Sequence, residues 1–367
     1  GIDVDETAIS KVDVVSKVLR YRGYNVNDLC EQTNFMQTAY LLMMGYLPHQ
    51  QDYDTFCESE KKQRMIPEPV VDLYTNLPSD GHMMNRVKIG VTLLGLLSNR
   101  YDYPLELDQL HHQMISLFAK IPTLISYAYR SAQGLPFLKP DPTLNYVDNF
   151  LYLITGKKPS SPLFSKVLDT TLILYAEHGF NASTFSARVT ASTLSDYYSA
   201  IAAAIGTLKG ALHGGANEQV MYMLQDIQSP KNAPDWLAKK LASKEKIMGF
   251  GHRLYRDGDS RVPMIRALGK SLAMDLNNTQ WHDICDILES EMIAKKNIYP
   301  NLDFPVAPAY YLLDIPICLY TPIFVASRIT GWSAHLVEQY AHNRLIRPSC
   351  HYVGHDPRDI LPIEKRD

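Results

Sequence analysis

The spacing of apolar side chains predicts α-helices along most of this chain. Between Asn34 and Tyr46, apolar residues recur at the intervals that place them on one face of a helix; they are Phe35, Ala39, Leu42, Met43 and Tyr46. Residues 87–97 are apolar nearly all round, which is typical of a helix buried on most sides. Residues 196–208 are rich in alanine, so we expect this helix to pack closely against another one, in the core or across a subunit interface.

The pattern offers little evidence for β-strands. It contains no run of alternating β-branched residues bounded by turns, and no series of strands alternating with helices. It shows no internal repeat with the length of a solenoid unit, and the 22 prolines fall mostly between the predicted helices. We therefore predict an all-α, mainly helical fold.

One apolar stretch, Phe304 to Ala326, is long enough to suggest a membrane span. Four prolines and Asp314 interrupt it, and a single spanning helix would have to absorb all of them. We therefore predict a buried, bent segment. The chain begins without a basic region followed by an apolar run, so no targeting signal is visible. The first residue is Gly1 and not Met, so removal of a presequence stays open as an alternative.

Length and composition narrow the class of protein. At 367 residues, with 46% hydrophobic and 20% charged residues, the chain is long enough for two domains and too apolar to be disordered. A net charge of −3 excludes nucleic-acid binding through bulk electrostatics, although it allows a local basic pocket for a phosphate. Five scattered cysteines form no CxxC pair, so we expect reduced thiols and a cytoplasmic location.

Two histidines stand in glycine-rich turns and are candidates for catalysis. His213 lies within residues 210–217 (GALHGGAN), and His252 lies within residues 249–253 (GFGHR). Glycine allows a ligand to approach the backbone closely, and an imidazole held there can donate or accept a proton near neutral pH. A single histidine of this kind is more often bonded to a backbone carbonyl, but two of them favour function. The second turn lacks the third glycine of a dinucleotide-binding loop.

A carboxylate and three arginines are the other candidates. Asp303 stands between an apolar run and prolines, where poor solvation raises the basicity of a carboxylate and suits it to act as a general base. An Asp that caps a turn is also common. Arg261, Arg328 and Arg347 have apolar neighbours, and a buried guanidinium needs an anionic partner. That partner is either a protein carboxylate or a small dicarboxylate bound through paired hydrogen bonds.

These motifs resemble the signatures of the citrate synthase family. They occur in the order and at the spacing of that family, over essentially the whole chain from about Thr7 to Arg366. The matching segments are residues 21–26 (YRGYNV), 176–184 (AEHGFNAST), 212–217 (LHGGAN), 249–253 (GFGHR), 300–303 (PNLD) and 344–348 (RLIRP).

The resemblance implies a mostly helical homodimer whose subunits each have two domains. Residues 1–213 and 309–367 would form a large domain that makes the dimer, and residues 214–308 a small domain that binds coenzyme A and closes over the site. Members of the family condense an acyl-CoA with oxaloacetate and hydrolyse the resulting thioester. They use neither a metal nor a resident cofactor, because the coenzyme A thioester is itself a substrate.

The resemblance also implies roles for individual residues. Asp303 would remove the α-proton of the acyl-CoA, His213 would hydrogen-bond the thioester carbonyl oxygen and stabilise the enol or enolate, and His252 would bond and protonate the ketone of oxaloacetate. The carboxylates of oxaloacetate would be held by His178, Arg261, Arg328 and, from the partner subunit, Arg347. Coenzyme A would contact Lys246, Gly249, Gly251 and Arg256.

Two departures from the usual citrate synthase pattern concern the choice of acyl-CoA. After Asp303, where that pattern has an aromatic residue and then Tyr-Ser-Gly, this chain has residues 304–308 (FPVAP). Asp-Ser-Arg at 259–261 replaces the common Asp-Pro-Arg. Both variants resemble the branch that contains 2-methylcitrate synthases of propionate breakdown. We therefore expect a 2-methylcitrate synthase, with some activity on acetyl-CoA because one methylene is worth only about 1–3 kcal/mol of discrimination.

Two alternatives stay open. The first is a citrate synthase that prefers acetyl-CoA, in which these departures are neutral drift. The second belongs to another class, a non-catalytic regulatory or binding protein that keeps the fold; such a protein would be expected to lose Asp303, His213 or His252, and all three are present. A hydrolase has less support, because the sequence contains no GxSxG nucleophile elbow.

Overall fold

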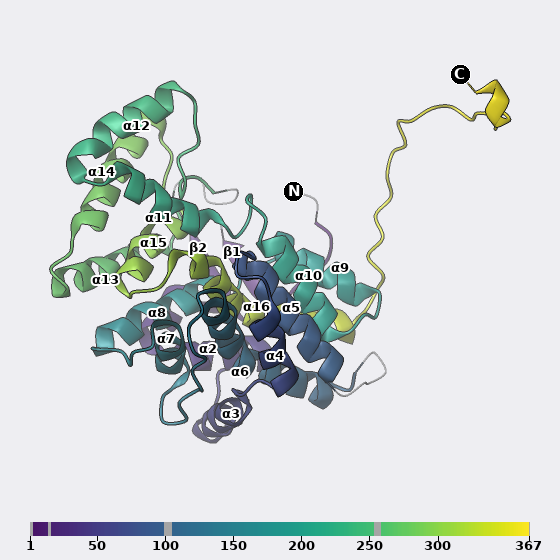
Figure 1. Cartoon of the computed structure of the whole chain (residues 1–367), viewed down its shortest axis with the longest axis horizontal. Helices are drawn as coiled ribbons and strands as arrows, with labels where there is room; N and C mark the ends of the chain where they lie inside the picture. Colours follow the sequence, from purple (N-terminus) through teal and green to yellow (C-terminus); the bar gives the residue numbers. More distant parts are fainter. Residues whose placement is uncertain (1–2, 14–15, 99–104, 253–257, 367) are drawn as a thin grey trace.

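Helices make up most of the molecule (Figure 1). The structure is a computed structural model and describes residues 3–13, 16–98, 105–252 and 258–366. The first helices are α1 (Val26–Gln32), α2 (Phe35–Met44), α3 (Gln50–Gln63), α4 (Glu68–Asn76), α5 (Met83–Leu97), α6 (Leu107–Ala132), α7 (Tyr146–Thr155) and α8 (Pro162–Tyr175). They are followed by α9 (Ala182–Ser192), α10 (Tyr197–Leu208), α11 (Ala216–Ile227), α12 (Ala233–Ala242), α13 (Val262–Asp275), α14 (Gln280–Lys296), α15 (Asp303–Leu312) and α16 (Tyr320–Ala341). The prediction of a mainly helical fold is confirmed.

A small antiparallel sheet near the N-terminus was not predicted. Strands β1 (Ser10–Asp13), β2 (Val18–Tyr21) and β3 (Tyr24–Asn25) pair in chain order. Strands of four and two residues are too short to show the alternation by which strands are recognised. Arg22 and Gly23 form the turn between β2 and β3, and both have positive φ, as a tight hairpin turn requires.

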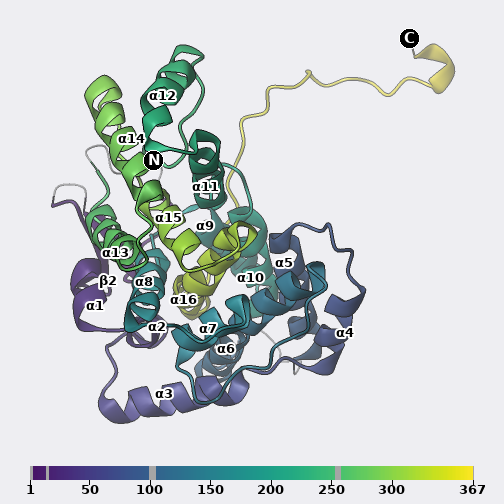
Figure 2. The ribbon, with the colours of Figure 1, turned by 60° about the vertical axis from the view of Figure 1, so that its left-hand side comes forward.

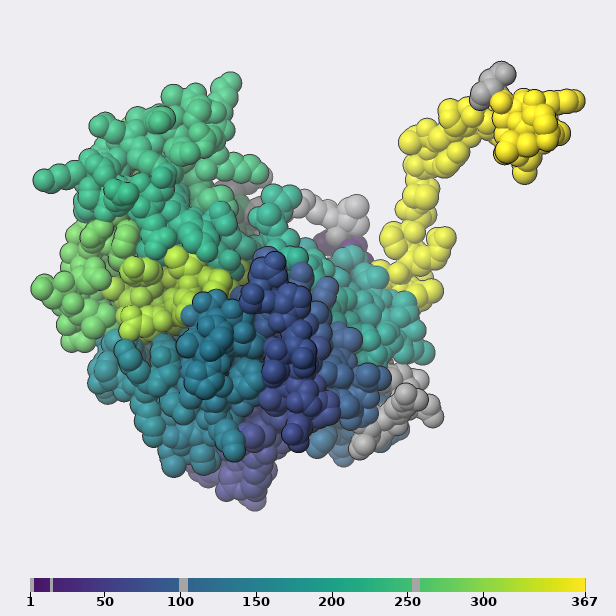
Figure 3. All heavy atoms as spheres, viewed as in Figure 1, coloured from purple at the N-terminus to yellow at the C-terminus, as the bar shows by residue number. Residues whose placement is uncertain are grey.

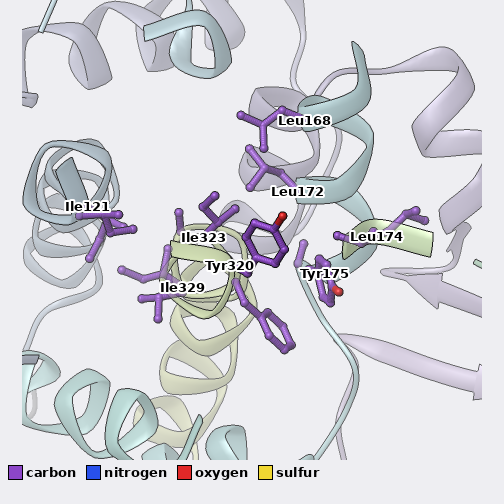
Figure 4. Close-up of a cluster of buried hydrophobic side chains, with 14 of the residues drawn as sticks. Ile121, Leu168, Leu172, Leu174, Tyr175, Tyr320, Ile323 and Ile329 are labelled. Carbon is purple, nitrogen blue, oxygen red and sulfur yellow. The ribbon is translucent and has the colours of Figure 1, made fainter. Parts of the chain in front are cut away.

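Helix α16 forms the centre of the core. It is buried over most of its length and packs against α2, α6, α8 and α9. Figure 4 shows the meeting of apolar side chains from α6, α8 and α16; the labelled residues are Ile121, Leu168, Leu172, Leu174, Tyr175, Tyr320, Ile323 and Ile329. Because neighbouring helices pack on so many sides of α16, the side chains on its remaining face have well-defined positions.

Helices α11, α12, α13 and α14 gather at one end of the molecule, as Figures 1 and 2 both show. Helix α15 packs against α11, α13 and α14 and also contacts α8. Helix α11 contacts α16 as well. The division into a domain of residues 214–308 and a domain formed by the rest of the chain stays a prediction.

The apolar stretch 304–326 is bent and buried, as predicted. Helix α15 ends at Leu312, a short 3₁₀ helix η2 (Ile317–Leu319) follows, and α16 then begins. Pro305 and Pro322 lie in the first turns of α15 and α16, Pro316 comes just before η2, and Pro308 lies inside α15. No helix in the described part of the chain is long and apolar enough to cross a membrane.

The predicted helices at 34–46 and 196–208 are present as α2 and α10. Helix α10 packs against α9 and α5, and its Ala200 and Ala204 are buried, in keeping with the close helix packing that its small side chains predicted. The prediction of a helix buried on most sides at 87–97 is wrong for this single chain. Helix α5 buries one face and exposes Ile89, Leu96 and Leu97. Apolar composition alone does not tell how many faces of a helix are covered.

The C-terminal segment leaves the body of the molecule. After α16, Asn343 and Ile346 still hydrogen-bond Ser192 at the end of α9. The later residues extend away from the other elements and carry a single turn of 3₁₀ helix, η3 (Ile363–Lys365), near the end (Figures 1 and 3). Almost all of these residues are exposed, including large apolar ones such as Tyr352, Val353 and Ile360.

Candidate active site

A cavity of about 1140 Å³ lies where the ends of several helices meet. It is lined by the end of α8, the turn before α11, the segment before α13, the N-terminus of α15 and one face of α16. Nine of the residues predicted to be functional line it: His178, His213, Lys246, Gly249, Gly251, His252, Arg261, Asp303 and Arg328. The tertiary structure therefore brings together side chains that are as far as 150 positions apart in the sequence.

Asp303 is the first residue of α15 and faces this cavity. Burial raises its pKa from 3.8 to about 6, although a hydrogen bond from Tyr175 and the charges of Arg261 and Arg328 oppose the rise. The Tyr175 hydroxyl donates to Oδ1 of Asp303 at 2.6 Å. At neutral pH, Asp303 is thus an ionised carboxylate that is more basic than an exposed one, as a general base requires.

His213 is neutral, and its contacts determine which ring nitrogen carries the proton. Burial and the charge of Arg328 lower its pKa to about 4. The backbone N–H of Ser183 points at Nε2 at 3.3 Å, and the Ser183 hydroxyl lies 2.8 Å from the same atom. A backbone N–H can only donate, so Nε2 accepts and the proton resides on Nδ1. No described residue accepts a hydrogen bond from Nδ1, so this N–H is available to a ligand in the cavity.

Glycine is required in the turn that carries His213. The His213 N–H donates to the Gly210 carbonyl, and the Gly214 N–H donates to the Leu208 carbonyl, so the chain folds back on the end of α10. A Cβ at Gly214 would come within 2.6 Å of Leu208. This close approach explains the glycine, and it fixes His213 immediately before α11.

The His252 turn and the Asp303 turn are joined by a short antiparallel ladder. The Gly251 N–H donates to the Tyr299 carbonyl and the Asn301 N–H donates to the Gly249 carbonyl, each at 2.9 Å. The Asn301 side chain donates to the Gly251 carbonyl at 3.0 Å and also accepts from the Asp303 N–H. The two motifs therefore form one rigid unit, and the predicted acid and base are held together.

Only glycine fits at position 249 of this ladder. Its φ is +79°, and a Cβ there would lie 2.7 Å from Val220 and 2.9 Å from Phe304. The backbone of residues 249–251 therefore packs directly against α11 and α15. The same segment borders the cavity from Glu245 to His252, where the backbone is open to a ligand.

His178 and His252 face each other across the cavity with their rings 5.2 Å apart and edge to face. Burial and the charges of Arg261 and Arg328 lower the pKa of His178 well below its usual range. Burial and Arg261 lower the pKa of His252 to about 4. Both imidazoles are neutral at physiological pH, so each carries one N–H and one acceptor nitrogen.

The two arginines of the cavity differ in what they already bind. Arg261 makes a bidentate ion pair with Asp259, with Nε and Nη2 at 2.9 and 2.7 Å from its carboxylate oxygens. Arg328 is 2% exposed, donates from Nε to the Tyr175 carbonyl, and stacks on the Phe324 ring. No carboxylate of the described residues lies within ion-pair distance of Arg328. A buried guanidinium in this state favours an anionic ligand.

A buried network supports the loop that carries His178. Glu177 accepts a hydrogen bond from Ser10 of β1 at 2.9 Å and lies 2.9 Å from Nε2 of His335 on α16. The Gly179 N–H also donates to Glu177. The unpredicted sheet therefore has a clear structural function, because β1 and α16 hold the His178 loop from opposite sides.

Comparison with known proteins identifies the family of the chain. A family profile described as "Citrate synthase, C-terminal domain" matches residues 1–349. The chain belongs to the citrate synthase family. The citrate synthase of Mycolicibacterium smegmatis is 46% identical over 98% of this chain and 96% of that protein. The 2-methylcitrate synthase of Mycobacterium tuberculosis H37Rv is 45% identical over 99% of this chain and 91% of that protein.

A solved structure in the citrate synthase family has the same fold over the full length. It is the ternary complex of carboxymethyl coenzyme A and oxaloacetate with citrate synthase from Thermoplasma acidophilum. Its TM-score to this chain is 0.93 at 30% identity, and the match covers 100% of this chain and 97% of that one.

Of the residues predicted from the citrate synthase resemblance, one falls outside the described part of the chain and another does not line the cavity. Arg256 lies outside the described residues. Arg347 lies in the extended C-terminal segment, is exposed, and does not line the cavity of its own chain. Residues 304–308, expected beside the acyl group, are buried within α15 and do not line the cavity either. Residues 304–308 can therefore affect the substrate only indirectly, for example through Asp303 or through Phe250, whose ring packs on Phe304.

The sequence analysis missed three polar residues and one aromatic residue at this citrate synthase site. Ser183 lies within the segment 176–184 that carries the family resemblance, and Tyr175 immediately precedes it. Asp259 was noted only as the neighbour of the variant Ser260, although it is paired with Arg261 at the start of α13. Phe324 contacts Tyr175 and Arg328, and nothing in its sequence context distinguishes it from a core residue.

Proposed function

We propose that the chain is a 2-methylcitrate synthase, which condenses propionyl-CoA with oxaloacetate and hydrolyses the thioester to 2-methylcitrate and coenzyme A. The observation that supports this most strongly is one cavity that combines a carboxylate of raised pKa with two neutral imidazoles and a buried guanidinium that lacks a carboxylate partner. These are the groups needed to make an enol from a thioester beside a dicarboxylate.

The first step is the removal of the α-proton of the thioester. Asp303 takes the proton, and the electron pair of the C–H bond moves into the carbon–carbon bond of the enol or enolate. The Nδ1–H of His213 donates to the thioester oxygen, on which negative charge develops. Because His213 is neutral, it stabilises this oxygen without a charge that would have to be desolvated.

The second step forms the new carbon–carbon bond. The nucleophilic α-carbon attacks the ketone carbon of oxaloacetate, and the N–H of His252 bonds the ketone oxygen and protonates it. Arg328, Arg261 and His178 hold the carboxylates. Water then hydrolyses the thioester and releases coenzyme A, whose adenine we expect along residues 246–251.

The choice of propionyl-CoA is supported by relatives named 2-methylcitrate synthase that are 42–45% identical over nearly the whole chain. A citrate synthase that prefers acetyl-CoA is the second candidate, because a relative of that name is 46% identical. One methylene changes the barrier by only about 1–3 kcal/mol, so we expect measurable activity on both thioesters.

Initial rates of coenzyme A release test this proposal. The enzyme is assayed with oxaloacetate and either propionyl-CoA or acetyl-CoA over a range of concentrations. A higher kcat/KM for propionyl-CoA is the expected result, by about tenfold or more. A clear preference for acetyl-CoA would make the chain a citrate synthase. Absence of release with either thioester would favour a non-catalytic protein.

We further propose a homodimer in which Arg347 of each subunit completes the oxaloacetate site of the other. Support comes from the C-terminal segment, in which Arg347 is exposed and does not line the cavity of its own chain, and whose later residues expose apolar side chains that a second subunit would cover. Dimers with two-fold symmetry exchange such segments reciprocally.

Mixed dimers test the exchange. Asp303→Asn and Arg347→Ala chains are each nearly inactive alone in this proposal. In a mixed dimer, the Arg347→Ala chain keeps Asp303 and receives Arg347 from its partner. Random mixing should therefore restore about a quarter of the wild-type activity. If both residues acted within one chain, mixing would restore nothing.

The proposed reaction needs no metal and no resident cofactor, because side chains supply the base and the hydrogen-bond donors. Activity should survive dialysis against a chelator, and loss that Mg²⁺ or Zn²⁺ reverses would contradict this. The cytoplasmic location predicted from the cysteines belongs to the same proposal, and fractionation of cells tests it.

A further inference from the structure

The hydroxyl of Tyr175 holds one oxygen of the proposed base. Tyr175 is the last residue of α8, and its side chain is 3% exposed. Its hydroxyl donates to Oδ1 of Asp303 at 2.6 Å, the range of a strong hydrogen bond to a charged acceptor. Burial raises the pKa of Tyr175 well above its usual range, so the hydroxyl keeps its proton and stays a donor at the pH of any assay.

The surroundings of Tyr175 fix it in this position. Its ring packs against Phe324 with centroids 4.4 Å apart. Its carbonyl accepts from Nε of Arg328 at 2.6 Å, and the carbonyl of Leu174 accepts from Arg261 and from the Tyr21 hydroxyl. The end of α8 is therefore tied to both arginines of the cavity, and Tyr175 cannot follow Asp303 if the carboxylate rotates.

We propose that Tyr175 is the positioning residue of Asp303: by occupying Oδ1 it leaves Oδ2 as the only oxygen that reaches the α-proton, and it stabilises the carboxylate form. This inference rests on the proposed role of Asp303 as the base. It holds equally for propionyl-CoA and acetyl-CoA, because both lose an α-proton to the same oxygen.

The charges around Asp303 do not replace this hydrogen bond. Arg261 and Arg328 favour the carboxylate, Asp259 disfavours it, and burial disfavours it most. Arg261 is already neutralised by Asp259. Tyr310, in the same helix as Asp303, donates its own hydroxyl to Thr171 and not to the carboxylate. Among the described side chains, only Tyr175 donates a hydrogen bond to the Asp303 carboxylate.

The variant Tyr175→Phe tests the proposal because it removes the hydroxyl and keeps the ring. In the wild type, kcat/KM should fall below a pH of about 6 as Asp303 is protonated. In Tyr175→Phe this acid limb of the pH profile should move to higher pH by about one to two units, because the carboxylate loses a hydrogen bond that stabilises it. On the plateau above it, kcat should fall about tenfold or more because Oδ2 is no longer oriented, while KM for oxaloacetate stays the same.

Tyr310→Phe is the matched control. It also removes one buried hydroxyl from the same region of the core, and the hydroxyl that it removes bonds Thr171. Its pH profile should match that of the wild type. If Tyr175→Phe gave the same profile and kcat as Tyr310→Phe, Tyr175 would be a packing residue and the proposal would be wrong.

Incorporation of a fluorinated tyrosine at position 175 provides a second measurement without loss of shape. The more acidic hydroxyl is a stronger donor, so the acid limb should move to lower pH, opposite to Tyr175→Phe; an unmoved limb would overturn the proposal. Failure of the proposed function is distinct from either result. In that case the wild type itself releases no coenzyme A from either thioester.

Discussion

Removal of the Ser183 hydroxyl should reduce catalysis by disturbing His213. Three polar atoms surround the Ser183 oxygen: Nε2 of His213 at 2.8 Å, the donating Nε1 of Trp332 at 3.2 Å, and Oδ1 of Asn181 at 2.8 Å. The hydroxyl has one hydrogen, and in the His213 tautomer with its proton on Nδ1 that hydrogen goes to Nε2 of His213. The side chain is fully buried, so water cannot take its place without displacing packed atoms. In Ser183→Ala, His213 keeps only the longer contact from the Ser183 N–H.

The magnitude follows from the contacts that are lost. The Trp332 N–H is left without an acceptor, which should lower the free energy of unfolding by about 1–3 kcal/mol. His213 loses its shorter hydrogen bond and no longer holds Nδ1–H firmly toward the thioester oxygen. A loss of about 1.5–3 kcal/mol in transition-state stabilisation corresponds to a fall in kcat of about 10- to 100-fold.

Coenzyme A release with saturating oxaloacetate measures this effect, and urea unfolding measures stability. KM for oxaloacetate should stay within about twofold, because Ser183 touches no residue assigned to its carboxylates. Ser333→Ala is the control, since Ser333 is fully buried on α16 and its hydroxyl is hydrogen-bonded to the Tyr197 hydroxyl, away from His213. If folded Ser183→Ala had the same kcat as Ser333→Ala, the hydrogen bond from Ser183 would not be needed to orient His213, and the reasoning would be refuted.

Three further predictions concern the base, the anion site and the ladder. Asp303→Asn should lower kcat about 10²- to 10⁴-fold in the release assay, while calorimetry still shows oxaloacetate binding. Burial raises the folded-state pKa of Asp303 from 3.8 to about 6, so the ionised carboxylate destabilises the wild type at pH 7 and this cost disappears as the pH falls. At pH 7 the free energy of unfolding of the variant should therefore exceed that of the wild type by no more than about 3 kcal/mol, and the difference should vanish near pH 4. Arg328→Met should raise KM for oxaloacetate about tenfold or more without lowering Tm, since it removes a buried guanidinium that has no carboxylate partner; a large fall in Tm with unchanged KM would show a structural role instead. Gly249→Ala should lower stability by about 2 kcal/mol or more, because its Cβ would lie 2.7 Å from Val220 at φ +79°, and thermal unfolding that matches the wild type would contradict the close packing of the ladder.

The helices could be predicted where one face is apolar and the other polar. Residues 34–46 show this pattern, and the helix is present as α2, but eight of its ten residues are buried, and Tyr46 lies beyond its end and is exposed. Residues 87–97 do not, because apolar residues occupy several faces, and the pattern could not say that Ile89 and Leu96 would be exposed in the single chain. The strands β1 to β3 escaped detection because four residues hold too few positions for a period to appear.

The candidate site shows the same division at the level of single residues. His213, His252 and Asp303 could be selected from the sequence because glycines, prolines and apolar neighbours surround them locally. Ser183 and Tyr175 could not, since their importance comes from contacts with residues 30 and 128 positions away. Hydroxyl groups occur throughout the chain, and only distance in space distinguishes one that bonds a catalytic side chain.

The amino-acid sequence by itself determines the helical class of the fold, the family, and the chemical types of the groups that meet at the cavity. These depend on periodicity and on short motifs, which are local properties of the chain. Only the tertiary structure decides the protonation of those groups, because burial and neighbouring charges make both His213 and His252 neutral and make Asp303 more basic. It also decides their orientation, through the ladder between residues 249–251 and 299–301 and through the hydroxyl groups of Ser183 and Tyr175. Desolvation and hydrogen-bond geometry arise when distant segments pack together, and for that reason they cannot be read from the order of residues alone.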